Sequence, residues 1–267
     1  MEDPARGIPP QVGTRIALSS IFLRRSPLAR ENYGPAGVRC LVAAVLLLAS
    51  HPRAYSNDRP TNPRLIRAGS SSYRVLVIGG LHGDENSALA VGLALEKKLL
   101  AGAQAWTSRA EVLMVPEANP TGISAHIRTT FQGVDLNRNF PTADWSLGRF
   151  GSRYFGGFSA ASEKETAFLV SLIRARRPSV IIALHSPLSC VNFDGPAQSL
   201  ASDVSKRLRL PLRPNIGYAT PGSLGAYAGI ERRIPTLTIE FPPTLSSTET
   251  NHFAEELIRF LTSLRKR

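Results

Sequence analysis

The fold is decided by residues 73–100, which read YRVLVIGGLHGDENSALAVGLALEKKLL. The first part, 73–80, is a short apolar run rich in β-branched residues that ends in two glycines, which is typical of a buried parallel strand. A polar loop follows, and residues 85–100 then carry leucines at helical spacing, namely Leu89, Leu93 and Leu100. The stretch therefore predicts a strand, a loop and a helix, the repeating unit of an α/β fold.

The same alternation continues to the end of the chain. A buried strand is predicted at 110–116, and a long loop rich in Gly and Asn then runs to residue 160. A helix begins at Ser162, where Ser162 and Glu165 have the spacing of a capping box, and Pro178 ends it. The remaining predicted elements are strands at 179–184 and 235–241 and helices at 197–208 and 249–265. We expect an α/β protein with a mainly parallel mixed sheet flanked by helices on both faces.

The composition excludes several classes of protein. The chain has 267 residues, of which 43% are hydrophobic, and this suffices for one core. Residues 1–70 hold 10 Arg and 4 acidic residues, so they account for +6 of the net charge of +12. The other basic residues lack aromatic interleaving, and no nucleic-acid partner is predicted. Two cysteines exclude a disulfide framework, and no stretch reaches the ~20 apolar residues of a membrane-spanning helix.

The N-terminal part differs from the rest. Residues 1–37 are rich in Pro, Gly and Arg, and we interpret them as disordered or as lying ahead of the true translation start. Residues 38–56 combine Arg39, an apolar run and a small-x-small motif, which resembles a signal peptide; the alternative is a displaced core helix. We expect a linker at 57–72 and the folded domain at 73–267. The protein would be exported, periplasmic or extracellular, if 38–56 is a signal peptide, and cytoplasmic otherwise.

Side chains that bind metals follow three of the predicted strands. His82 and Glu85 follow the first strand, His185 follows the strand at 179–184, and Glu240 ends the last strand. Because carboxyl ends of parallel strands meet at one edge of a sheet, we expect these groups to lie together. Two imidazoles and a carboxylate are the ligand set of a catalytic zinc, and a fourth, unligated carboxylate is then available as a base. A lone histidine after a strand is more often structural than catalytic. Of the five histidines in the chain, we assign no role to His51, His126 and His252.

These residues and their order resemble the carboxypeptidase A-like zinc peptidases. The family's first two ligands come as His-x-x-Glu, as His82 and Glu85 do here, and His185 is similar to its third ligand. The resemblance continues in three further segments: Asn119–Gly122, Gly133–Pro141 and Thr238–Pro242. It implies a carboxypeptidase-like fold, a zinc peptidase catalytic domain at 73–267, and one zinc ion per chain.

The resemblance also implies roles for four residues around the metal. Asn137 and Arg138 would bind the terminal carboxylate of a peptide substrate, a task that suits a planar guanidinium. Asp135 would orient the ring of His82 without itself binding the metal. Arg128, seven residues before Asp135, is similar to the arginine that polarises the scissile carbonyl and stabilises its oxyanion.

Two more assignments follow from the same resemblance. Glu240 would be the catalytic glutamate, which removes a proton from the attacking water and passes it to the leaving amine. The family's mobile tyrosine is predicted at Tyr227 in preference to Tyr218.

Within the family, three strings are most similar to the murein peptide amidases, which split the γ-D-glutamyl–meso-diaminopimelate bond of cell-wall peptides. They are His185–Pro196, Pro221–Gly225 and Glu240–Pro243. The substrate would be a small cell-wall peptide with a free carboxylate that Arg138 could bind. The mature chain would have no stable membrane insertion, and its oligomeric state stays open.

Three other functions remain open at this point. A general metallocarboxypeptidase that releases C-terminal amino acids would share every residue named above. A desuccinylase or deacylase on the same scaffold would keep the ligands and the base, although the segment Asp135–Pro141 favours a peptide carboxylate. A non-enzymatic binding module would normally have lost a ligand or the base, and none is missing here.

Overall fold

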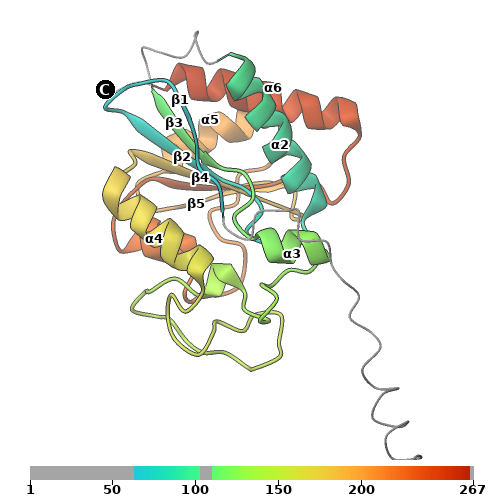
Figure 1. Cartoon of the computed structure of the whole chain (residues 1–267). Helices are drawn as coiled ribbons and strands as arrows, with labels where there is room; N and C mark the ends of the chain where they lie inside the picture. Colours follow the sequence, from blue (N-terminus) through green and yellow to red (C-terminus); the bar gives the residue numbers. More distant parts are fainter. Residues whose placement is uncertain (1–62, 103–109, 265–267) are drawn as a thin grey trace, which may run out of the picture. The chain divides into compact units, whose positions relative to one another are not determined.

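The computed structural model describes residues 63–102 and 110–264 (Figure 1). The chain divides into two compact units, 1–55 and 56–267, and all of the first unit lies outside the described residues. The predicted extension at 1–37 and the signal-like segment at 38–56 therefore lie outside them too. Within the described ranges, no helix is long and apolar enough to cross a membrane.

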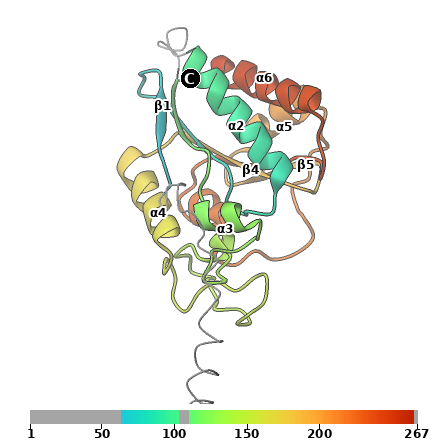
Figure 2. The ribbon, with the colours of Figure 1, turned by 45° about the vertical axis from the view of Figure 1, so that its right-hand side comes forward.

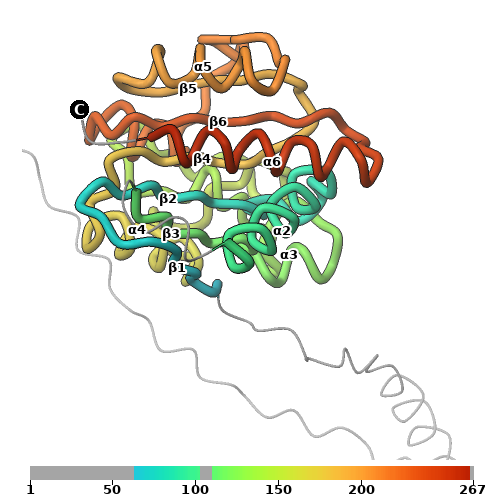
Figure 3. Tube along the Cα trace, turned by 90° about the horizontal axis from the view of Figure 1, so that it is seen from above, coloured from blue at the N-terminus to red at the C-terminus, as the bar shows by residue number. Residues whose placement is uncertain are grey.

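A six-stranded sheet forms the centre of the second unit, with the strand order β1-β3-β2-β4-β6-β5, which can be followed in Figure 3. Its four inner strands are parallel to one another, whereas β1 and β5 are antiparallel edge strands. The bounds are β1 Ile66–Ala68, β2 Arg74–Ile78, β3 Glu111–Val115, β4 Val180–His185, β5 Cys190–Asp194 and β6 Thr236–Glu240. The prediction of a mainly parallel mixed sheet is confirmed.

The edge strand β1 corrects the prediction of a linker at 57–72. Its three residues pair with β3, with Arg67 opposite Leu113. Arg67 also forms an ion pair with the buried carboxylate of Glu111, which further attaches this segment to the sheet. A strand of three residues is too short to show the alternating pattern from which strands are predicted.

Helices cover both faces of the sheet, as the two side views show (Figures 1 and 2). On one face, α2 (Asn86–Ala101) packs against α6 (Ser247–Ser263), and α6 packs against α5 (Gln198–Leu208). The other face carries α4 (Lys164–Arg176). Alternate residues of β2 supply the two cores: Val75 and Val77 join the first, and Leu76 and Ile78 join the second.

The start of α4 differs from the prediction. The helix begins at Lys164 with Glu163 at the N-cap, and no side chain caps it, so the predicted capping box of Ser162 and Glu165 is wrong. The hydroxyl of Ser162 instead accepts a hydrogen bond from the amide of Asn139 and donates one to Glu163. This loop contact takes Ser162 out of the capping position.

A capping box does occur at the start of α6, two residues before the predicted start of that helix. The Ser246 hydroxyl accepts from the backbone N–H of Glu249, and the Glu249 carboxylate accepts from the backbone N–H of Ser246. Two short helices complete the part of the fold that borders the site: α3 (Pro120–Ala125) and the single turn η1 (Leu136–Arg138). A π-helical segment, η2 (Gly225–Ile230), precedes β6.

Candidate metal centre and substrate pocket

The loop after β2 brings the first two candidate ligands to the carboxyl edge of the sheet. It carries His82, and Glu85 is the N-cap residue of α2. Gly83 packs directly on α3, since a Cβ atom at this position would lie 2.0 Å from the carbonyl carbon of Gly122. This close approach requires glycine and holds the loop against its neighbour.

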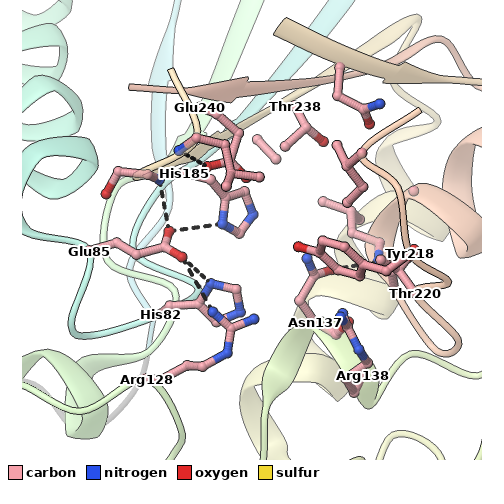
Figure 4. A pocket seen from close by; sticks show the side chains of 18 of the residues that line it. His82, Glu85, Arg128, Asn137, Arg138, His185, Tyr218, Thr220, Thr238 and Glu240 are labelled. Carbon is pink, nitrogen blue, oxygen red and sulfur yellow. Dashed lines mark hydrogen bonds and ion pairs between the residues drawn. The ribbon is translucent and has the colours of Figure 1, made fainter. Parts of the chain in front are cut away.

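Three side chains converge on one point at that edge (Figure 4). One carboxylate oxygen of Glu85 lies 2.6 Å from Nδ1 of His82, and the other lies 2.9 Å from Nδ1 of His185. Ligand atoms of the three residues all lie within 4.8 Å of one another, and both imidazoles are buried. The arrangement offers two ring nitrogens and a carboxylate to a single ion, which fits the donor set of a catalytic zinc.

Asp135 fixes the orientation of His82. Its Oδ1 lies 3.0 Å from Nε2 of His82, on the side of the ring that faces away from Glu85. With the ring N–H donated to Asp135, the Nδ1 lone pair is directed to the point where the three ligands converge. Asp135 is fully buried, and Arg128 donates to its other oxygen at 3.0 Å.

The charges within this cluster shift the pKa values of its own members. Burial opposes a charged imidazole at His82, but the neighbouring carboxylates of Glu85 and Asp135 outweigh it and raise the pKa to about 9. Burial also opposes ionisation of Glu85 and Asp135, yet the pKa of each lies well below its ordinary value because of the adjacent imidazoles. The site is therefore built for positive charge, which a divalent cation would supply.

Glu240 is a carboxylate beside the metal ligands but outside the group that converges on the ion. It ends β6, where its register partner on β4 is His185. The backbone N–H of Leu188 donates to Glu240 Oε2 at 3.3 Å. Burial, more than any other cause, raises the pKa of Glu240. A carboxylate with such a raised pKa binds and releases protons more readily near neutral pH.

A pocket of ≈340 Å³ opens beside the cluster. Its lining includes every sequence-predicted site residue but two, Asp135 and Tyr227. Arg138 is 6% exposed and donates from Nη1 to the backbone oxygen of Asn137 at 2.7 Å. The side-chain oxygen of Asn137 in turn accepts from the backbone N–H of Leu224 at 2.9 Å, so the pair is held at the pocket wall.

The structure corrects the choice of tyrosine. Tyr227 lies on η2, fully buried, with its ring 5.6 Å from that of Phe140 and the guanidinium of Arg232 3.4 Å from its centroid. Tyr218 lines the pocket instead and is 53% exposed. Spacing along the chain does not reveal which of two tyrosines faces a pocket, because both lie in the segment between α5 and β6.

Sequence reasoning missed several pocket residues that come from loops and from the edge strand. Tyr154 lies in the long loop before α4, and three guanidinium groups lie within 5.5 Å of its ring centroid, those of Arg128, Arg138 and Arg153. The pocket also contains Asp194, at the end of β5. No local motif marks Tyr154, whereas Asp194 lies within the string His185–Pro196, in which the sequence analysis assigned a role to His185 alone. Two histidines predicted to have no role, His126 and His252, do not line the pocket.

Fold and site together define a metallopeptidase, and the chain belongs to the zinc carboxypeptidase family. The model of that family matches residues 53–211, a range that includes all three candidate ligands and ends before Glu240. A zinc-dependent peptidase acting on a peptide substrate is thus the class of this protein.

Among its relatives, murein peptide amidase A of Escherichia coli (strain K12) is 34% identical over 185 residues, covering 65% of this chain and 73% of that protein. The crystal structure of the murein-tripeptide amidase from Escherichia coli O157 matches with a TM-score of 0.62 at 28% identity, covering 81% of this chain and 98% of the other. Carboxypeptidase A from Helicoverpa armigera shares the fold, with a TM-score of 0.58 at 19% identity over 76% of this chain and 69% of the other.

Proposed function

We propose that the protein hydrolyses the γ-D-glutamyl–meso-diaminopimelate amide bond of murein peptides in a zinc-dependent reaction. One observation carries the proposal: a single pocket holds the three candidate ligands, the separate carboxylate of Glu240, and the pair Asn137 and Arg138. The finer substrate assignment is supported by the 34% identity to murein peptide amidase A.

His82, Glu85 and His185 would hold the zinc ion, and Asp135 would keep His82 in the ligating tautomer. When bound, zinc supplies a Lewis acid that polarises the scissile carbonyl and makes a water molecule acidic. Side chains of the pocket would transfer the protons, stabilise the oxyanion and bind the substrate.

Glu240 is the proposed general base and acid. Its raised pKa suits it to take a proton from the attacking water and to give that proton to the leaving amine. Arg128 is proposed to stabilise the oxyanion that develops on the scissile carbonyl, since it lines the pocket 3.5 Å from Glu85. Its bond to Asp135 holds the guanidinium in place.

The substrate's free carboxylate is proposed to bind Asn137 and Arg138. The buried guanidinium of Arg138 offers a planar pair of N–H donors, and Tyr218 lies in the same pocket. A general carboxypeptidase would use the same pair for an ordinary peptide, so these residues favour a peptide with a free C-terminus without selecting its linkage. The linkage assignment rests on the relatives and on the similarity of the three strings in 185–243.

Export of the protein to the periplasm or beyond is part of the proposal. It rests on the signal-like composition of residues 38–56, and it would bring the enzyme to cell-wall peptides.

The test compares the zinc-loaded protein with Glu240→Gln on L-Ala-γ-D-Glu-meso-diaminopimelate. We expect kcat to fall by roughly 10²–10⁴-fold, the range of general acid–base catalysis, with the zinc content unchanged. The His82→Ala protein should lose both its activity and its bound zinc. Glu255→Gln, an exposed carboxylate on α6, is the matched control and should keep full activity. Ordinary turnover by Glu240→Gln would remove Glu240 from the mechanism.

A further inference from the structure

Arg153 is a cation in the pocket to which the proposed mechanism gives no task. It lies in the long loop before α4, its side chain is exposed, and it lines the pocket together with Arg128 and Arg138. Among residues 63–102 and 110–264, no carboxylate forms an ion pair with it. The pocket therefore holds a guanidinium that is free to bind an anion from outside the chain.

The ring of Tyr154 gathers three guanidinium groups. Its centroid lies 5.5 Å from the guanidinium carbon of Arg128, 5.4 Å from that of Arg138 and 5.5 Å from that of Arg153. No two of these carbons can thus lie more than 11 Å apart, which is twice the longer distance. The contacts with the ring hold the cations near one another although like charges repel, and an anion bound among them would offset that repulsion.

The loop that carries Arg153 is anchored beside the metal centre. The backbone N–H of Asp135 donates to the carbonyl oxygen of Phe155 at 2.8 Å. Phe155 is buried, and its ring meets those of Phe150 and Phe158 edge-on, with centroids 5.3 and 5.2 Å away. The backbone that carries Arg153 is therefore held at a defined place relative to the candidate ligands.

Two of the three guanidiniums lack an anion in the described part of the chain. Arg128 is paired with Asp135 at 3.0 Å and lies 3.5 Å from Glu85, whereas Arg138 and Arg153 form no ion pair there. The proposed function supplies one carboxylate, the terminal one, for Arg138. A second carboxylate on the substrate is the partner that suits Arg153, because the paired N–H donors of a guanidinium match the two carboxylate oxygens.

The exposure of the three arginines indicates which part of the substrate each one meets. Arg138 is 6% exposed, the side chain of Arg128 is 14% exposed, and Arg153 belongs to the exposed residues. A residue released from the end of a peptide lies innermost in a pocket, and the acyl part continues outward past the scissile carbonyl. The order from Arg138 through Arg128 to Arg153 follows that path. Arg153 therefore adjoins the acyl-side residue, which contributes the scissile carbonyl.

We propose that Arg153 binds a carboxylate on the acyl-side residue of the substrate. The inference rests on the proposed function and deepens it, because a glutamyl residue joined through its γ-carboxyl group keeps a free α-carboxylate. That carboxylate lies four bonds, or roughly 5 Å, from the scissile carbonyl carbon. Tyr154 holds the guanidinium within reach of it. Arg153 is a specificity residue, and it takes no part in bond cleavage.

The experiment uses the zinc-loaded full chain and two substrates that differ in one charge. L-Ala-γ-D-Glu-meso-diaminopimelate has the free α-carboxylate, and the same peptide with D-isoglutamine has a neutral carboxamide of similar shape. The wild type should prefer the carboxylate in kcat/KM. Arg153→Gln should lower that preference roughly 5- to 10-fold, mainly through KM, a modest factor because the residue is exposed. Arg149→Gln is the matched control, since it removes the same charge from an exposed position of the same loop that does not line the pocket.

The comparison of the two substrates separates a binding role of Arg153 from a structural one. An equal loss of activity on both substrates would overturn the inference, because a structural role does not distinguish a carboxylate from a carboxamide, and so would an unchanged preference. A change confined to the preference for diaminopimelate over lysine at the released position would also overturn it, since the bound carboxylate would then lie on the other side of the scissile bond.

A binding measurement keeps the inference separate from the proposed function. Calorimetric Kd values for the same two peptides are measured on the zinc-loaded Glu240→Gln protein, with and without Arg153→Gln. A preference in Kd that Arg153→Gln removes would support the inference even if the wild type left the γ-linked bond intact and the proposed function failed. Equal Kd values for the two peptides would contradict the inference whether or not the bond is cut.

Discussion

Replacement of Asp135 by Asn should weaken zinc binding without touching a metal ligand. Asp135 is fully buried and uses both oxygens: Oδ1 faces Nε2 of His82 at 3.0 Å, and Oδ2 accepts from Arg128 at 3.0 Å. An Asn side chain has one oxygen and one NH₂ group. In either orientation the NH₂ group meets a donor, the guanidinium of Arg128 or the ring N–H of His82, so one of the two contacts is lost.

The size of the effect follows from what these contacts do. Loss of a buried partner that orients a ligating imidazole typically lowers metal affinity 10- to 100-fold, which corresponds to about 1.4–2.8 kcal/mol. We expect a zinc Kd raised by that factor, measured by competition with a chromophoric chelator at constant pH. Activity at saturating zinc should fall too, because a neutral amide holds the guanidinium of Arg128 less tightly than the carboxylate does in either orientation.

The matched control is Asp84→Asn. Asp84 is exposed and lies in the same loop, next to Glu85, yet it is not among the converging ligands. Its replacement removes the same charge near the metal and should leave the zinc Kd nearly unchanged. The reasoning would be refuted by an Asp135→Asn protein that binds zinc as tightly as Asp84→Asn.

Three further substitutions test other parts of the structure. Arg138→Lys keeps the charge but loses the planar pair of donors, so KM for the peptide should rise roughly tenfold or more in steady-state kinetics, and an unchanged KM would exclude Arg138 from carboxylate binding. Tyr227→Phe removes a buried hydroxyl that has no partner among the described residues, so thermal stability and activity should both be retained; a large loss of activity would restore a catalytic role. Ser246→Ala removes the cap of α6 and should lower the free energy of unfolding by about 1 kcal/mol in urea titration, whereas no change would contradict the capping box.

The inner part of the fold and the metal centre could be predicted because both depend on short local patterns. Parallel strands buried on both faces read as continuous apolar runs, such as the one that forms β2. The residues after such strands share one edge of the sheet, and this rule alone is enough to place His82, His185 and Glu240 together.

The edges of the sheet and the pocket wall could not be predicted, since they depend on contacts between distant segments. Strand β1 has three residues and is held through pairing with β3. The side-chain direction of Tyr218 and Tyr227 depends on how the segment before β6 packs on Phe140. Asp194 was missed because Gly225 and Gly229, which make space for it, lie far along the chain and meet it only in the folded protein.

The most direct test of the central claim is mass spectrometry of the products formed from L-Ala-γ-D-Glu-meso-diaminopimelate by the zinc-loaded protein, beside ordinary C-terminal peptides and with a chelator control. The account predicts release of free diaminopimelate that stops when the chelator removes zinc and that exceeds any release from ordinary peptides. Release of ordinary C-terminal residues with the γ-linked tripeptide left intact would contradict it and would make the protein a general carboxypeptidase.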